Sequence, residues 1–103
     1  MAVTTNYILS ELVALMTSPL RIPRPHQIVI LDSISAAPWV EVVHIDAGLD
    51  KAGGDLMRRH PDKDWSLVDC SSFVVMTQRG ISTALTGDRH FEQAGFVRLL
   101  KPR

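Results

Sequence analysis

Residues 39–45 have the sequence WVEVVHI, a run of aromatic and β-branched side chains that lies between Pro38 and Asp46. This composition and these boundaries are typical of a β-strand. Apolar residues recur at helical spacing on both sides of the run. A chain in which strands alternate with helices is expected to form a mainly parallel sheet covered by helices on both faces.

Upstream of this strand, the pattern predicts helices over residues 26–37 and residues 6–16. Thr5 and Asn6 both suit the N-cap of the earlier helix, because their side-chain oxygens can accept a backbone N–H bond. Residues 2–5 are short and partly β-branched, and we expect them to end a buried strand.

Downstream, Asp46 is expected to cap a helix over residues 46–60, which Gly53 and Gly54 weaken by about 1 kcal/mol each relative to alanine. Ser66 begins a further helix that ends at Gly80. The side chains that this helix is expected to bury are Leu67, Cys70, Phe73, Val74 and Thr77. Strands over residues 81–86 and 96–100 complete a predicted order of β-α-α-β-α-α-β-β.

The chain has 103 residues, which favours one domain over residues 1–103, and its 46% hydrophobic content can fill a core. Its formal net charge is zero, so binding of nucleic acid by charge alone is disfavoured. The charge is unevenly distributed, at −3 over residues 1–50 and +3 over residues 51–103. The basic second half could follow a phosphate backbone, although a solvated surface explains most of these charges equally well.

Cys70 is the single cysteine, so no internal disulfide can form and a reducing compartment is expected. The N-terminal residues lack the basic segment and cleavage site of a signal peptide. No apolar run reaches the length of a membrane span. We therefore expect a cytoplasmic protein without a membrane partner.

Three acidic residues stand out, and each also has a purely structural interpretation. Glu11 lies among apolar helical neighbours, where a carboxylate needs a partner or a route to water. Asp69 follows Ser66 at the spacing of a capping box, and by itself it is more simply a cap than a ligand. Asp88 follows a predicted strand and suits a turn, because an Asp side chain can bond its own backbone.

The order in which these acids occur supports a joint function. Three segments, TTNYILSE (4–11), DWSLVDCSSF (64–73) and ALTGDRHF (84–91), resemble the PIN-domain family, and among its members the VapC-type toxins of prokaryotic toxin–antitoxin pairs. The segments occur in the order and spacing of the family and together span most of the chain. The resemblance implies a three-layer α/β/α domain with a mainly parallel sheet.

By the same resemblance, the chain is expected to be a metal-dependent endoribonuclease that hydrolyses RNA phosphodiester bonds. Glu11, Asp69 and Asp88 match the carboxylate cluster that binds Mg²⁺ or Mn²⁺, and hard oxygen ligands suit these ions. Polar groups beside the cluster are expected from Thr5, Asn6 and Ser66. The expected RNA contacts are Arg58, Arg59 and Arg89, and the expected protein partner is a small antitoxin.

The chain departs from the family at its start. It begins at the strand that is second in the family, and no aspartate precedes Asp32, so the first carboxylate of the cluster is absent. We expect this truncation at the N-terminus to impair metal binding and turnover, and the exposed strand edges to favour a homo-oligomer. An alternative stays open, in which the chain is a catalytically inactive PIN fragment that acts as a binding or oligomerisation module.

The remaining candidate groups are weaker. His26, His44 and His60 show no paired metal-ligand spacing, and His90 is more simply a turn histidine than a phosphate contact. Cys70 is expected to lie in the core.

Overall fold

The computed structural model describes residues 1–101, which form two units: Met1–Ile45 and a second unit that begins at Asp46. Each unit is described by itself below. Within residues 1–101, no helix has the length and apolar character needed to cross a membrane.

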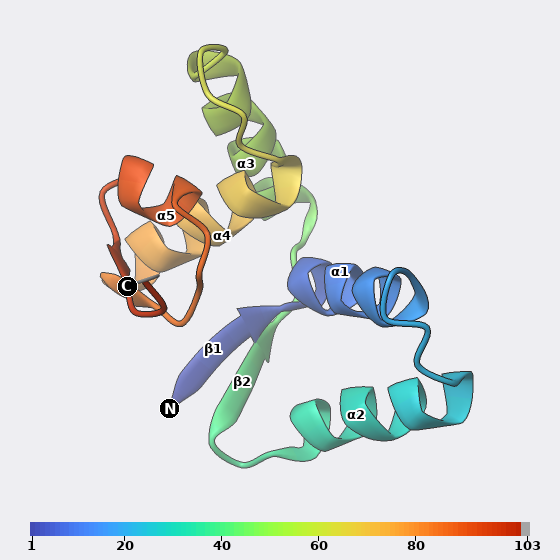
Figure 1. The fold of residues 1–103 in the computed structure, drawn as a ribbon. Coiled ribbons are helices and arrows are strands. Elements are labelled where there is room, and N and C mark those ends of the chain that lie inside the picture. Colours follow the sequence, from blue (N-terminus) through green and yellow to red (C-terminus); the bar gives the residue numbers. More distant parts are fainter. Residues whose placement is uncertain (102–103) are drawn as a thin grey trace. The chain divides into compact units, whose positions relative to one another are not determined.

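The first unit is built around two parallel strands, β1 (Ala2–Thr5) and β2 (Val40–Val43), which lie side by side in Figure 1. The connection between them contains two helices, α1 (Asn6–Thr17) and α2 (Arg24–Ala36). Such a crossover is what parallel strands require. The parallel pairing predicted from the alternation of strands and helices is confirmed, with each element within about two residues of its predicted bounds.

Two polar side chains join β1, α1 and the end of β2. The Oγ1 atom of Thr5, a residue only 2% exposed, accepts a hydrogen bond from the backbone N–H of Ile8 at 3.1 Å, so the predicted N-cap is confirmed. The Oδ1 atom of Asn6 accepts from the backbone N–H of Ile45 at 2.6 Å. The first bond stabilises the turn from β1 into α1, and the second holds this turn beside Ile45, just after β2.

The second unit contains two long helices, α3 (Ala47–Arg59) and α4 (Leu67–Arg79), and a smaller α/β part. That part consists of β3 (Thr83–Ala84), α5 (His90–Gln93) and β4 (Val97–Arg98), and its two strands are parallel. Asp46 caps α3 through a bond from Leu49 N to its Oδ1 at 2.8 Å, as predicted. Gly80 ends α4 in the left-handed conformation, with φ of 66°, where glycine avoids the steric penalty of a Cβ atom.

Gly53 explains how α3 can approach α4 closely. A Cβ atom at this position would lie 2.7 Å from Oγ of Ser71 and 3.2 Å from its Cα. The two glycines that weaken α3 as an isolated helix are therefore not equivalent. Gly53 leaves room for the backbone of the neighbouring helix.

The core of the second unit is aromatic. Cys70, Trp65 and Phe73 are buried together, and the ring of Phe73 meets those of Trp65, Phe91 and Phe96 at centroid distances of 5.2, 4.9 and 5.6 Å. Rings tilted or perpendicular to one another at these distances attract through their edges and faces. The predicted core position of Cys70 is confirmed, and burial raises the pKa of its thiol.

Some local predictions are wrong. Leu67 and Thr77 are exposed on α4, whereas Ser71 and Val75 are buried, because α4 packs on α3 as well as on the aromatic core. The strand expected over residues 81–86 is regular only at β3, although ladder bonds continue to Thr86 O from Leu100 N. Helix α5 was not predicted, since four residues are too few for a helical period.

Candidate metal centre

Asp69 lies in the first turn of α4, where it completes a capping box. Its backbone N–H donates to Oγ of Ser66 at 3.0 Å, and its Oδ2 accepts from the backbone N–H of Ser66 at 3.1 Å. The structural interpretation of this residue is thus confirmed. A carboxylate oxygen has further lone pairs, however, so the cap does not exhaust its capacity as an acceptor.

Asp88 lies in the turn between β3 and α5. Its backbone N–H donates to Oγ1 of Thr86 at 3.0 Å, and its Oδ1 accepts from the backbone N–H of His90 at 2.9 Å. This is the turn geometry expected for an aspartate that bonds its own backbone two residues on. It also draws His90 back towards the carboxylate of Asp88.

The imidazole of His90 lies between the two carboxylates. Its Nδ1 is 3.1 Å from Oδ2 of Asp69, a hydrogen-bond distance, and 3.4 Å from Oδ1 of Asp88. Ligand atoms of these three residues all lie within 4.8 Å of one another. Among the described residues 1–101, these side chains form the one group of three or more acidic, histidine or cysteine side chains that meets this distance. The start of α4 and, about 20 residues later, the turn that leads into α5 thus bring three potential metal ligands to one place.

Helix α5 is held in position by its other side chains. Phe91 packs against Phe73 in the aromatic core, and Oε1 of Gln93 accepts a bond from Nε1 of Trp65 at 3.1 Å. His90 therefore stands at the start of a helix that is anchored on both sides. The core that stabilises the unit also fixes the orientation of the candidate ligand.

The three side chains differ in their access to water. Those of Asp69, His90 and Asp88 are 15%, 25% and 43% exposed. The group therefore has a sheltered side at α4 and an open side at the turn, and the open side would allow water or a phosphate to approach.

The donor set fits a divalent metal ion. Two carboxylates supply hard oxygen ligands of the kind that Mg²⁺ and Mn²⁺ prefer. An imidazole nitrogen is a poorer ligand for Mg²⁺ than for first-row transition metals, so with His90 included the set suits Mn²⁺ better. Three protein donors also leave coordination positions for water.

The structure brings together two of the three acids predicted from sequence. Asp69 and Asp88 lie in the second unit, whereas Glu11 is an exposed residue of α1 in the first unit. The predicted neighbours Thr5, which is buried in β1, and Asn6, which is half-buried at the start of α1, also belong to the first unit. The grouping of Glu11 with the two aspartates stays a prediction. Ser66 lies beside the cluster through its bonds with Asp69.

Sequence reasoning missed His90 as a candidate ligand. A histidine two positions after a turn aspartate predicts that the two side chains lie close together. The reason is that the Asp carboxylate can accept a hydrogen bond from the backbone N–H of the histidine. That signal is weak without knowledge of Asp69, which lies 21 residues earlier in the chain.

The three arginines expected to contact RNA lie in the second unit. Arg89 and Arg59 are exposed, Arg89 between Asp88 and His90. Arg58 is also exposed, but its Nη1 pairs with Oδ1 of Asp55 at 3.3 Å, and Lys51 pairs with the other oxygen of Asp55 at 3.1 Å. These bonds lower the pKa of Asp55, with Lys51 as the main cause.

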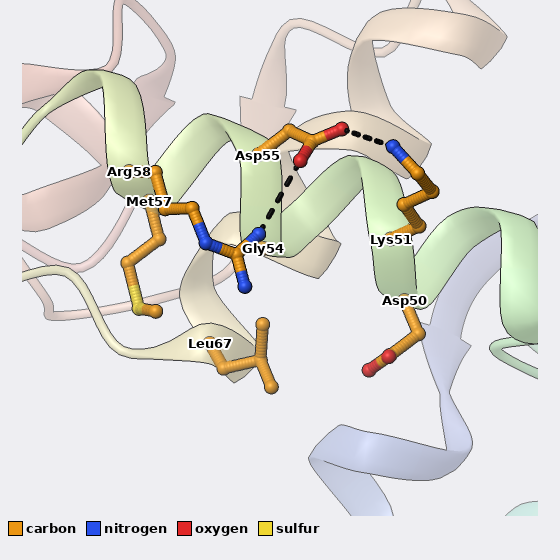
Figure 2. A pocket seen from close by; sticks show the side chains of 7 residues that line it. All are labelled: Asp50, Lys51, Gly54, Asp55, Met57, Arg58 and Leu67. Carbon is orange, nitrogen blue, oxygen red and sulfur yellow. Dashed lines mark hydrogen bonds and ion pairs between the residues drawn. The ribbon is translucent and has the colours of Figure 1, made fainter.

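An open pocket of about 460 Å³ lies beside this group. Figure 2 shows the side chains that line it, with Asp50 and Leu67 on the side away from Asp55. The pocket carries both acidic and basic groups, and the guanidinium of Arg58 extends across Gly54. Such a mixed lining does not form an anion site by itself. The roles of the three arginines towards RNA stay predictions.

Comparison with known proteins identifies the relatives of this fold. The PIN domain family matches residues 1–97. The 23S rRNA-specific endonuclease VapC20 from two strains of Mycobacterium tuberculosis is 37% identical over 65 residues, which cover 63% of this chain and 50% of VapC20. The chain therefore spans about half the length of the curated relatives it matches.

The crystal structure of M. tuberculosis VapC20, described as a Sarcin-Ricin loop cleaving toxin, superposes on this chain with a TM-score of 0.82. The two are 32% identical, and the match covers 94% of this chain and 72% of the VapC20 chain. The α/β fold with parallel strands agrees with this match. The chain belongs to the PIN-domain family.

Proposed function

We propose that the chain is a metal-dependent endoribonuclease domain of the PIN/VapC type. The observation that carries this proposal is the convergence of Asp69, Asp88 and His90, whose ligand atoms lie within 4.8 Å of one another. Homology to VapC20, named as a 23S rRNA-specific endonuclease, supports RNA as the class of substrate. Glu11 is proposed as a third acid of the site.

The chain's own residues would prepare the site before substrate arrives. The capping box holds one oxygen of Asp69 in place, and the turn at Thr86 holds Asp88. Their carboxylates repel each other, so a cation between them is favoured electrostatically. A divalent ion bound there supplies an activated water and neutralises charge that develops on a phosphate.

RNA with accessible bases is the expected target, because loops and single strands expose the bases and the backbone together. Arg89, next to Asp88, is the arginine best placed for a phosphate near the cluster, and Arg58 and Arg59 are proposed as more distant contacts. A small antitoxin protein is the proposed inhibitor, by analogy with the VapC-type relatives. A cytoplasmic location follows from this proposal, because its substrate is found there.

The test is cleavage of a mixed single-stranded RNA and of a hairpin RNA, with Mn²⁺, with Mg²⁺ and with chelator. We expect cleavage that requires the metal, is faster with Mn²⁺, and is lost in Asp69→Asn and Asp88→Asn. Asparagine keeps an oxygen acceptor for the Ser66 and His90 backbone bonds, so both variants should fold.

The matched control is Asp62→Asn, which removes the same charge from an exposed residue that pairs with its neighbour Lys63 at 3.6 Å. This control should cleave like the unmodified protein, whereas loss of cleavage in identically purified Asp69→Asn excludes a contaminating nuclease. Equal inertness of all proteins, with metal bound, would contradict the proposal. It would instead support the inactive fragment that acts as a binding or oligomerisation module.

A further inference from the structure

The turn that carries Asp88 and His90 is tied to the interior of its unit by Arg98. This residue belongs to β4, and its side chain is only 14% exposed. Its Nη1 donates to the backbone oxygen of Gly87 at 2.8 Å, one residue before Asp88. A largely buried cation thus contacts the backbone next to a candidate ligand.

The same guanidinium also reaches α5. Its Nε donates to Oε1 of Glu92 at 3.1 Å, two residues after His90. Lys101 also bonds to Oε1 of Glu92, at 3.2 Å, so two cations meet the same carboxylate oxygen. Arg98 therefore bonds to both ends of the segment that contains the two proposed ligands, at Gly87 before Asp88 and at Glu92 after His90.

The geometry of arginine suits this role. The guanidinium is a rigid planar group whose donors point in fixed directions, so two bonds from it define the separation of the groups that accept them. Lysine has a single ammonium on a flexible stem and cannot reproduce this pairing. The bond to Gly87 also acts on the backbone, so it sets the position of Asp88 without occupying its carboxylate.

We propose that Arg98 is a positioning residue for the metal centre, which holds Asp88 and His90 at the separation from Asp69 that binds a divalent ion. This inference rests on the proposed function, because it concerns the same metal site. It adds a residue that is not itself a proposed metal ligand. Arg98 lies on β4, outside the turn that it holds in place.

The experiment is a calorimetric titration of Mn²⁺ into the unmodified protein and into Arg98→Gln, Arg98→Lys and Lys101→Gln. Replacement of groups that bond directly to metal ligands typically changes metal affinity by about 10–100-fold. Arg98 acts one residue further away, through Gly87 and Glu92, so we expect a loss near the lower end, about tenfold, in Arg98→Gln and a smaller loss in Arg98→Lys. All titrations are made well below the melting temperature of each variant, so that only folded protein is compared.

Lys101→Gln is the matched control. Lys101 also bonds to Glu92, at 3.2 Å, but it is 62% exposed and no bond from it to Gly87 is found in residues 1–101. Its replacement removes one positive charge and one Glu92 contact while leaving the Gly87 contact intact. We expect its Mn²⁺ affinity to remain within twofold of that of the unmodified protein.

A second measurement does not depend on metal. The backbone N–H of His90 donates to Asp88 in the turn, so its exchange with solvent deuterium reports the order of that turn. We expect faster exchange at His90 in Arg98→Gln in the presence of chelator, and unchanged exchange in Lys101→Gln. If Arg98→Gln is too unstable to titrate, Arg98→Lys takes its place in the exchange measurement. Faster exchange at His90 in that variant then supports the role of Arg98, and unchanged exchange refutes it.

The outcomes separate the two proposals. If the unmodified protein binds Mn²⁺ and folded Arg98→Gln binds it equally well, with unchanged exchange at His90, the role of Arg98 is refuted and the proposed function stands. If the unmodified protein binds no Mn²⁺, the proposed metal site fails and the role of Arg98 in it fails too.

Discussion

Asp69 has a structural role and a geometry suited to metal binding at the same time. From sequence, the cap and the ligand are competing interpretations of this residue. The structure confirms the cap, yet Oδ2 of Asp69 also faces His90 at 3.1 Å. A carboxylate can serve both because it accepts several bonds, and the cap bond fixes its orientation. The proposed ligand therefore comes already positioned by the start of α4.

His90 gives a prediction at the scale of a single residue. Replacement by alanine should lower Mn²⁺ affinity at least about tenfold, since removal of a ligand matters more than removal of its outer partners. Mg²⁺ affinity should fall less, because Mg²⁺ favours oxygen ligands over imidazole. Calorimetric titration of both ions into the variant measures the difference.

The control for this variant is His44→Ala, which removes an exposed histidine after β2. It should leave both affinities unchanged. Equal metal binding by His90→Ala and the unmodified protein would exclude His90 from the ligand set and leave a site of carboxylates alone.

At the scale of elements, the two adjacent glycines of α3 predict opposite effects on stability. Gly53→Ala gains up to about 1 kcal/mol in helix propensity. However, its methyl group would meet Ser71 at 2.7 Å from Oγ and 3.2 Å from Cα, and such overpacking costs about 1–3 kcal/mol. The variant should lose stability overall.

Gly54→Ala is the matched control. Its methyl group would meet the end of the flexible Arg58 side chain, with Nη1 at 3.1 Å, and an exposed side chain can move away. The helix-propensity gain should then dominate, for a net stabilisation of up to about 1 kcal/mol. Urea unfolding followed by circular dichroism compares the two. A Gly53→Ala protein as stable as Gly54→Ala would contradict the close approach of α3 to α4.

Helix α5 shows why a short element escapes prediction from sequence. Its four residues have no period of their own, and its position depends on Phe91 against Phe73 and Gln93 against Trp65. These partners lie 18 or more residues away in sequence. Because α5 begins at His90, missing the helix and missing the candidate ligand have one cause.

At the scale of the whole molecule, we expect the chain to form a dimer or a higher oligomer. Each strand pair within residues 1–101 has two strands only, and unpaired backbone edges favour association with another chain. Large apolar side chains are also exposed, among them Val29, Trp39 and Leu85. Sedimentation at micromolar concentration should give at least twice the mass of one chain. A monomer at these concentrations would contradict the prediction.

The sequence by itself determined the α/β fold class, the long helices and their caps, and the two aspartates of the candidate centre. These features are local: helical spacing, strand composition and cap residues act within a few positions of one another. Only the tertiary structure decided that His90 faces Asp69 and that Arg98 bonds to the turn that contains Asp88. Those contacts join residues 11 to 21 positions apart, and packing of the aromatic core, which no local pattern encodes, sets their distances.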